Sequence, residues 1–309
     1  MKLCFFDDFK LGLVKDDTAV VDLTEIVRAV PRVHPQDLLA HVIEHFAEFR
    51  EKFAAAARQA GVPLTSVRLR SPVPRPLNIV CMAVNYMEDG TRSEPAPINA
   101  FHKSPLSVIG PGDTMVLPDV PAKVFEGEAE VAVVIGKTAS NVSEAEAMSQ
   151  VFGYVNFIDG SARGLPPSGN TFYQMKSRAT FAPIGPWIVT ADEIKDPQNL
   201  KVRLWNNGDL KQSFNTNDMA HSIAKTIAFV SSLHPLVPGD ILATGTNHRG
   251  LHAFQNGDRI ELEVDGLGRL TFNVSDSLRR SWPRETRLER QTKGLDPLAP
   301  QASGKYAGG

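Results

Sequence analysis

The sequence predicts an α+β protein dominated by β-strands, in which a small N-terminal α/β unit precedes a β-rich domain. Short strand-like segments separated by turns make up most of the chain beyond residue 77, and few helical patterns interrupt them. The first 60 residues instead combine short strands with one long helical pattern. Between them, residues 71–76 carry three prolines, which favour an extended connection. We therefore expect a small domain over residues 1–70, a catalytic domain over 71–280 and a C-terminal arm over 281–309.

The N-terminal unit begins with short strands. Residues 11–14 and 19–21 are apolar and flank the polar turn 15–18, a pattern typical of a β-hairpin. From residue 35 to residue 60 apolar side chains recur every three or four positions, and Gly61 follows as a plausible end of the helix. The unit is thus predicted to be a hairpin with one long helix.

The larger domain contains a series of predicted strands, at residues 78–83, 128–135, 154–158, 187–190, 202–205, 241–244 and 259–264. Ser143 and Glu146 have the spacing of a capping box, which predicts a helix that ends at Gly153. A second helix over residues 219–230 is expected to begin after Asn217 and Asp218. The segment from residue 279 onwards lacks periodicity, so we expect an arm that packs on a neighbouring subunit or is partly disordered.

Composition excludes several classes of protein. The chain is 42% hydrophobic and carries 33 basic against 35 acidic residues, without the basic surplus typical of nucleic-acid binding. No stretch approaches the ~20 apolar residues of a membrane span, and the opening residues do not resemble a signal peptide. Cys4 and Cys81 lie in apolar runs, as packed thiols of a reducing compartment would. We expect a cytoplasmic protein with neither nucleic acid nor membrane as partner.

Three short motifs give no support for other enzyme classes. Residues 41–45 match the H-x-x-E-H pattern of certain zinc peptidases, but they equally form the solvated face of the predicted helix. A phosphate-binding loop before Gly136 would require glycine where Val131 stands. In residues 160–164 the serine is second rather than third, which does not fit the nucleophile elbow of serine hydrolases.

One cluster of acidic residues does predict chemistry. Glu126, Glu128 and Glu130 alternate along a predicted strand, so all three carboxylates face one side of it. Asp159 ends the next predicted strand. An all-oxygen set of this kind favours Mg²⁺, Mn²⁺ or Ca²⁺ over zinc or copper. The alternative is an edge strand that carries solvated glutamates to prevent aggregation.

Four collinear runs resemble the fumarylacetoacetate hydrolase superfamily. Residues 128–137 are similar to its E-x-E-L-x-V-V-I-G-K signature, and residues 153–163 to its G-Y-T-x-x-N-D-V-S-A-R run. Residues 181–190 resemble P-L-G-P-W-I-V-T, and residues 237–246 match P-G-D-x-I-x-T-G-T. The resemblance covers roughly residues 77 to 275 in the family's own order.

The resemblance implies a mixed β-sandwich or β-roll behind a small variable N-terminal domain, a homodimer, and one divalent cation, with Mg²⁺ expected and Mn²⁺ or Ca²⁺ possible. Glu128, Glu130 and Asp159 fall on the family's three metal carboxylates, whereas Glu126 does not fall on a usual ligand. Other matched positions are expected to line the site. The basic residues Arg163 and Lys176 are expected to act in catalysis and to bind substrate. Tyr86 and Thr246 are expected to bind substrate.

The resemblance also implies a small 2-oxo or β-diketo acid as substrate, chelated by the cation through its carboxylate and keto oxygens. We expect hydrolytic cleavage of a C–C bond in an acylpyruvate-like acid through a metal-stabilised enolate. An oxaloacetate-type decarboxylase, an enol–keto tautomerase or isomerase and a hydratase would share that enolate, so they remain alternatives. A catalytically silent relative that only binds metal is a further alternative. The sequence does not identify the exact substrate.

The sequence departs from the family at one motif. Many members that hydrolyse C–C bonds carry N-Y-x-x-H-x-x-E, whose histidine, oriented by the glutamate, activates water. Here Asp89 stands at the histidine position and Arg92 at the glutamate position. The candidates for a replacement base are Asp89, Glu94, His102 and His248. We favour His248, because it follows the Gly-Thr loop and histidine exchanges protons readily near neutral pH; the alternative is a loop histidine in solvent.

Overall fold

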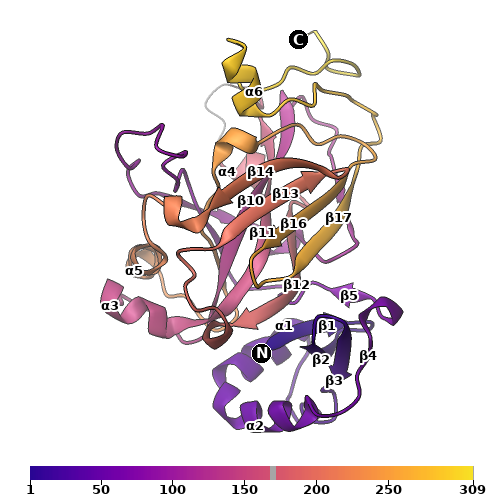
Figure 1. The fold of residues 1–309 in the computed structure, drawn as a ribbon, viewed down its shortest axis with the longest axis vertical. Coiled ribbons are helices and arrows are strands. Elements are labelled where there is room, and N and C mark those ends of the chain that lie inside the picture. The colour runs from indigo at the N-terminus through magenta and orange to yellow at the C-terminus, as the bar shows by residue number, and fades with distance from the viewer. Residues whose placement is uncertain (168–171, 309) are drawn as a thin grey trace.

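The computed structural model describes residues 1–167 and 172–308, so residues 168–171 of the predicted catalytic domain and residue 309 of the predicted arm lie outside the described residues. The fold is the α+β, sheet-dominated one that the sequence predicts (Figure 1). Its helices are α1 Pro35–Glu44, α2 Phe46–Ala56, α3 Glu144–Ala147, α4 Phe172–Lys176, α5 Ile223–Leu233 and α6 Arg287–Thr292. Its strands are β1 Lys2–Phe6, β2 Lys10–Lys15, β3 Ala19–Asp22, β4 Val62–Pro63, β5 Leu69–Arg70, β6 Ile79–Met82, β7 Ala100–Lys103, β8 Val108–Ile109, β9 Thr114–Val116, β10 Val124–Ile135, β11 Val151–Arg163, β12 Ala182–Thr190, β13 Lys201–Asn206, β14 Asp209–Asn215, β15 Ile241–Ala243, β16 Arg259–Val264 and β17 Arg269–Ser275.

Two sheets pack on each other in the larger part of the molecule. The main sheet has the order β4-β3-β2-β1-β12-β11-β10-β15-β6-β7, and the smaller sheet has the order β14-β13-β16-β17-β9. The long strands β10, β11 and β12 lie against the smaller sheet (Figure 1), and an apolar core that includes Val131, Leu204, Leu262 and Phe272 fills the space between the sheets. The strands that carry the predicted carboxylates are therefore central to the fold.

The N-terminal unit joins the main sheet through β1, which pairs with β12. The expected long helix over residues 35–60 is wrong as a single helix, because the chain turns at His45 and separates α1 from α2. The turn lets Phe46 pack on Phe152, with ring centroids 4.9 Å apart, while Phe53 is fully buried on α2. Packing between the unit and the main sheet thus overrides the continuous helical periodicity.

Two other helix boundaries differ from the sequence prediction. The capping box of Ser143 and Glu146 is present, but α3 ends at Ala147, and Gly153 lies inside β11. A Cβ at Gly153 would lie 2.2 Å from the carbonyl oxygen of Val189, so glycine allows the close approach of β12. Helix α5 begins after Ser222, whose side chain accepts a hydrogen bond from the Lys225 N–H, rather than after Asp218.

The C-terminal segment is ordered against the rest of its own chain. Helix α6 begins with a capping box formed by Thr286 and Glu289. The indole N–H of the buried Trp282 donates to the Lys123 carbonyl at 2.8 Å, and the guanidinium of Arg287 binds the Glu126 carboxylate. The segment therefore forms part of the wall around the acidic cluster.

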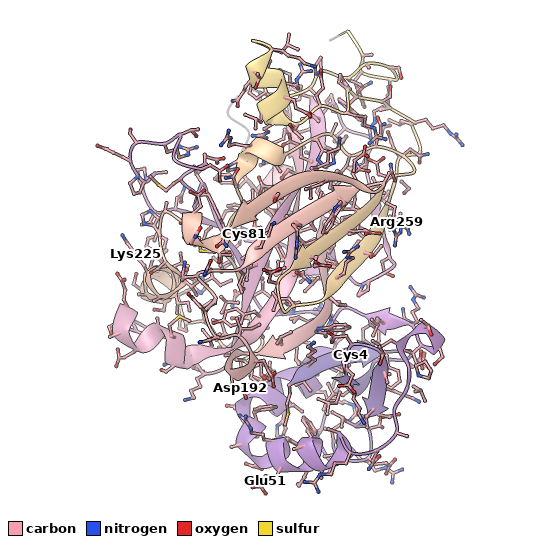
Figure 2. The ribbon with its side chains drawn as sticks, in the orientation of Figure 1. Cys4, Glu51, Cys81, Asp192, Lys225 and Arg259 are labelled. Carbon is pink, nitrogen blue, oxygen red and sulfur yellow. The ribbon has the colours of Figure 1, made fainter. Side chains whose placement is uncertain are left out.

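Both cysteines are free and buried, as expected for packed thiols. Cys4 lies in the N-terminal unit and Cys81 in the larger part of the molecule (Figure 2). Burial raises the pKa of the Cys4 thiol to about 12, so this thiol stays protonated at neutral pH.

A buried histidine predicts acid sensitivity. The His252 ring lies 3.0 Å from the Asn206 amide, and burial, with the Lys211 charge second, lowers the pKa of His252 from 6.5 to about 4. Between pH 6.5 and pH 4, His252 is therefore protonated in the unfolded chain but not in the folded chain. The free energy of unfolding thus falls as the pH drops from 6.5 towards 4. At about 1.4 kcal/mol per pKa unit this one group accounts for roughly 3 kcal/mol. Urea unfolding at pH 7 and pH 4.5 should show a smaller loss for His252→Gln than for the parent; an equal loss would contradict the assignment.

Candidate active site

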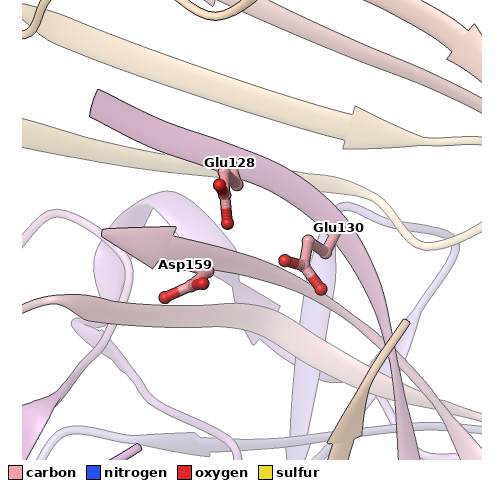
Figure 3. Close-up of side chains that lie close together, drawn as sticks. All are labelled: Glu128, Glu130 and Asp159. Atoms are coloured by element: carbon pink, nitrogen blue, oxygen red, sulfur yellow. The ribbon is translucent and has the colours of Figure 1, made fainter. Parts of the chain in front are cut away.

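Three carboxylates meet on the two longest strands of the fold. The antiparallel register of β10 and β11 places Glu128 directly opposite Asp159, and Glu130 lies two residues further along β10. One oxygen from each of the three lies within 4.8 Å of the others, and all three side chains are buried. Figure 3 shows them pointing toward one another. The edge-strand alternative is wrong, because β10 lies between β11 and β15 and its glutamates are not solvated.

Positive side chains surround this cluster. The Lys176 ammonium, carried by α4, donates to Glu128 at 2.6 Å and to Asp159. The Lys103 ammonium, from β7, donates to Asp159 at 2.7 Å and to the Gly160 carbonyl at 3.0 Å. At the end of β11, Arg163 binds Glu128 and donates to Glu126 at 3.1 Å. The structure thus brings Arg163 and Lys176 to the carboxylates that the sequence predicted.

The pKa values of the carboxyl groups diverge within the cluster. Burial favours the neutral acid everywhere, but Lys176 and Arg163 outweigh it at Glu128 and hold its pKa well below the ordinary value. Burial and the charges of Asp159 and Glu128 raise the pKa of Glu130 well above its ordinary value. Burial also raises the pKa of Asp159. The cluster is therefore short of positive charge around Glu130.

The donor set fits a divalent cation with oxygen ligands. Three converging carboxylates from two rigid strands are the ligand type that Mg²⁺ and Mn²⁺ prefer. The fourth acid of the sequence pattern is engaged differently, because both oxygens of Glu126 are bound by Arg287. This separation agrees with the expectation that Glu126 is not a usual ligand.

The loop that follows β15 is hydrogen-bonded to residues of β10. The Thr244 N–H and hydroxyl both donate to the Val131 carbonyl, the Gly245 N–H donates to Glu130 at 2.7 Å, and the Thr246 hydroxyl donates to the Ala129 carbonyl at 2.7 Å. Gly245 adopts a φ of +89°, a conformation that favours glycine. The loop therefore holds His248 next to the acidic cluster.

His248 forms a pair with a glutamate that the sequence interpretation did not select. Its Nδ1 lies 2.6 Å from Glu88 Oε1, and its backbone N–H donates to Glu88 Oε2 at 2.9 Å. Its Nε2 lies 3.8 Å from Glu128 Oε1. With Nδ1–H donating to Glu88, Nε2 is left as an acceptor that faces the cluster. The alternative of a loop histidine in solvent is wrong, since only 22% of the side chain is exposed.

The segment that carries Glu88 has an unusual backbone. Val84, Glu88 and Asp89 adopt φ values of 54°, 56° and 54°, which are uncommon for residues other than glycine and rare for a β-branched one. Asn85 fixes the segment by donating to the His221 and Thr244 carbonyls at 3.1 and 2.9 Å. Such strain persists only where surrounding contacts hold it, as they commonly do at functional sites.

The remaining predicted residues have packing roles in the described structure. Tyr86 is fully buried with its ring edge-to-face on Phe214, and the Thr246 hydroxyl is engaged by β10 and by Gln212 at 3.0 Å. Their predicted contacts with substrate stay predictions. Among the other candidate bases, Asp89 pairs with Arg249 at 2.9 Å, and the His102 ring lies 5.0 Å from that of His234.

Comparison with known proteins identifies the family. Residues 78–275 match the model of the fumarylacetoacetate (FAA) hydrolase C-terminal domain. The chain is 33% identical to oxaloacetate tautomerase YisK of Bacillus subtilis over 85% of this chain and 95% of that protein. It is 31% identical to maleylpyruvate hydrolase of Aquipseudomonas alcaligenes over 89% of this chain and 99% of that protein. The chain belongs to the fumarylacetoacetate hydrolase family and, like these two relatives, is an enzyme.

A solved structure matches the fold over almost its whole length. Maleylpyruvate hydrolase from Sphingobium sp. SYK-6, in complex with manganese(II) and pyruvate, superimposes with a TM-score of 0.80 at 36% identity, covering 89% of this chain and 99% of that one.

No helix in residues 1–167 and 172–308 is long and apolar enough to cross a membrane.

Proposed function

We propose that this enzyme hydrolyses a C–C bond in a small acylpyruvate-like 2-oxo acid, with a divalent cation held by Glu128, Glu130 and Asp159. The observation that carries the proposal is the His248–Glu88 pair beside those carboxylates. It supplies a base in place of the family's histidine–glutamate lid dyad, at whose positions this chain has Asp89 and Arg92. The manganese and pyruvate of the Sphingobium relative support this class of cofactor and substrate.

The bound cation would supply Lewis-acid stabilisation of the enolate charge that develops when the C–C bond breaks. His248 Nε2 accepts a proton from water, and the resulting hydroxide attacks the carbonyl carbon distal to the 2-oxo acid. The electron pair of the broken C–C bond stays with the pyruvate portion. The carbon of that portion that carried the bond then takes up a proton. The products are pyruvate and a second carboxylic acid.

The basic residues have separate roles in this scheme. Lys176 and Arg163 neutralise Glu128 and Asp159 and supply positive charge towards the substrate carboxylate. Glu88 holds the His248 ring with Nε2 directed at the cluster. The Thr246 hydroxyl is held by β10, and Tyr86 is fully buried against Phe214; we expect both residues to line the substrate site. We propose Mg²⁺ as the resident ion, with Mn²⁺ able to replace it, and a homodimer in the cytoplasm as the working state.

Enol–keto tautomerisation of oxaloacetate is the second candidate. It is favoured by the 33% identity to oxaloacetate tautomerase YisK. The same carboxylates and cations would stabilise the shared enolate without an activated water, and decarboxylation could follow the same route.

Parallel assays would separate these activities. The purified protein, with Mg²⁺ or with EDTA, is incubated with oxaloacetate and with an acylpyruvate, and the products are resolved by NMR. We expect Mg²⁺-dependent cleavage of the acylpyruvate into pyruvate and a second acid. Accelerated enol–keto exchange of oxaloacetate, or its conversion to pyruvate, without acylpyruvate cleavage would assign the tautomerase or decarboxylase reaction instead. Metal binding without turnover of either acid would indicate a catalytically silent relative.

A further inference from the structure

Gln212 is a buried amide that joins two parts of the active site. It lies on β14 of the smaller sheet, which packs on β10 (Figure 1), and 1% of it is exposed. Its Oε1 accepts from the Ala129 N–H at 3.2 Å, while its Nε2 donates to the Thr246 hydroxyl and to the Asn247 carbonyl, both at 3.0 Å. This orientation of the amide matches all three groups, whereas a flipped amide would face the Asn247 carbonyl with its oxygen.

The first of these contacts lies between two of the clustered carboxylates. Ala129 separates the two glutamates of β10 that belong to the cluster. Strand β15 pairs with β10 at Ala132–Val134, and beyond β15 the following loop and Gln212 bind the edge of β10 in place of a strand. The Ala129 N–H is bound by Gln212, and its carbonyl accepts from the Thr246 hydroxyl at 2.7 Å. Gln212 therefore holds the segment of β10 that presents both glutamates.

The contact with Asn247 lies directly before His248. The peptide unit that joins these two residues is planar, so its carbonyl and its N–H point in opposite directions. Gln212 binds the carbonyl, and Glu88 accepts from the N–H at 2.9 Å. The same Glu88 carboxylate binds Nδ1 of the His248 ring. Gln212 and Glu88 thus hold one peptide plane from its two edges and fix the point from which the His248 side chain starts.

We propose that Gln212 is a positioning residue for the base: its amide fixes His248 relative to the carboxylates of β10, with Nε2 3.8 Å from Glu128 Oε1. Because Gln212 is buried and both of its N–H groups are occupied, it acts through these neighbours rather than on the substrate. This inference rests on the proposed function, since hydrolysis needs a base. Loss of the amide would leave the carboxylates in the register of β10 and β11 but loosen the loop that carries His248.

Gln212→Met tests the role, because methionine is similar in length but has no amide. With saturating Mg²⁺ it is expected to lower kcat for acylpyruvate hydrolysis by about 10- to 100-fold, since a misplacement of about 1 Å can cost that much, and to change KM less than about threefold. Enol–keto exchange of oxaloacetate, which needs no activated water, should also change less than about threefold. Gln36→Met is the matched control, because the buried Gln36 likewise binds a backbone N–H and a backbone carbonyl, those of Arg75 and Gly239. It should lower the free energy of unfolding without changing kcat.

The His248→Ala background separates positioning from a general loss of packing. If Gln212 acts through His248, adding Gln212→Met to His248→Ala should lower hydrolysis less than about threefold further. A further loss as large as in the parent background, equal losses in hydrolysis and enol–keto exchange, or an unchanged kcat would each overturn the inference. If Gln212→Met does not fold, Gln212→Asn, which keeps the amide but is shorter by one methylene, is measured in the same way.

NMR of the His248 ring tests the same point without turnover. With ¹⁵N-labelled histidine, and with the signal assigned by its absence in His248→Ala, the Nδ1 proton of the parent should exchange slowly with water because Glu88 holds it. Exchange should be faster in Gln212→Met, where the ring opens more often, and unchanged in Gln36→Met. An unchanged rate in Gln212→Met would overturn the inference. If the Mg²⁺-loaded parent shows this proton but cleaves no acylpyruvate, the proposed function fails, while the rate in Gln212→Met still decides whether Gln212 positions His248.

Discussion

Replacement of Glu130 by glutamine is expected to remove metal binding and turnover while leaving the fold intact. The Gly245 N–H that donates to Glu130 at 2.7 Å can donate to an amide oxygen as well. Burial and the neighbouring carboxylates raise the pKa of Glu130, so they already disfavour the charge that the amide removes. Only the charge and one ligand oxygen are lost. Without the bound cation the enolate loses several kcal/mol of Lewis-acid stabilisation. This corresponds to a loss on the order of 10³-fold in kcat/KM.

Glu126→Gln is the matched control, because it changes a buried glutamate on the same strand that binds Arg163 and Arg287. It should lower the free energy of unfolding by weakening a buried ion pair but keep Mn²⁺ affinity within a few-fold. Titration calorimetry with Mn²⁺ and urea unfolding distinguish the two variants. Unchanged Mn²⁺ affinity in Glu130→Gln would remove this residue from the ligand set.

Sequence reasoning located the acidic cluster because its signal is local. Glu128 and Glu130 lie two apart on one strand, so period-two alternation alone places them on one face. Asp159 follows from the next strand along the chain, and the antiparallel register of β10 and β11 brings it opposite Glu128. The family resemblance added Arg163 and Lys176, which the structure places against these carboxylates.

The parts that sequence reasoning missed depend on contacts between distant segments. Lys103 reaches Asp159 only because β7 and β6 complete the far side of the main sheet. Glu88 and His248 are 160 positions apart, and no periodicity links them. A cavity lined by Arg92 and His248 likewise includes Arg287 of the C-terminal segment in its lining. A local sequence pattern does not indicate which distant segments of the chain come into contact, whereas the tertiary structure shows these contacts directly.

Replacement of His248 by alanine should give the second large effect, a loss of about 10²- to 10⁴-fold in C–C hydrolysis, the usual range for a general base. Enol–keto exchange of oxaloacetate should fall much less, because that reaction does not need an activated water. The two reactions, followed by NMR on the same Mg²⁺-loaded sample, therefore separate a role in water activation from a role in shaping the site. Hydrolysis within a few-fold of the parent would dismiss His248 as the base.

Glu88→Gln provides the sharper form of that test. The amide oxygen can still accept from His248 Nδ1 at the position where Glu88 Oε1 lies, but it no longer stabilises positive charge on the ring, and the amide NH₂ cannot accept the His248 backbone N–H as Glu88 Oε2 does. A positioning role therefore predicts a lower kcat with little change in KM, and a smaller loss than in His248→Ala. Because both changes act through one proton transfer, the double variant should be little worse than His248→Ala alone. Additive losses would mean that Glu88 and His248 act separately, and the water would then need another base.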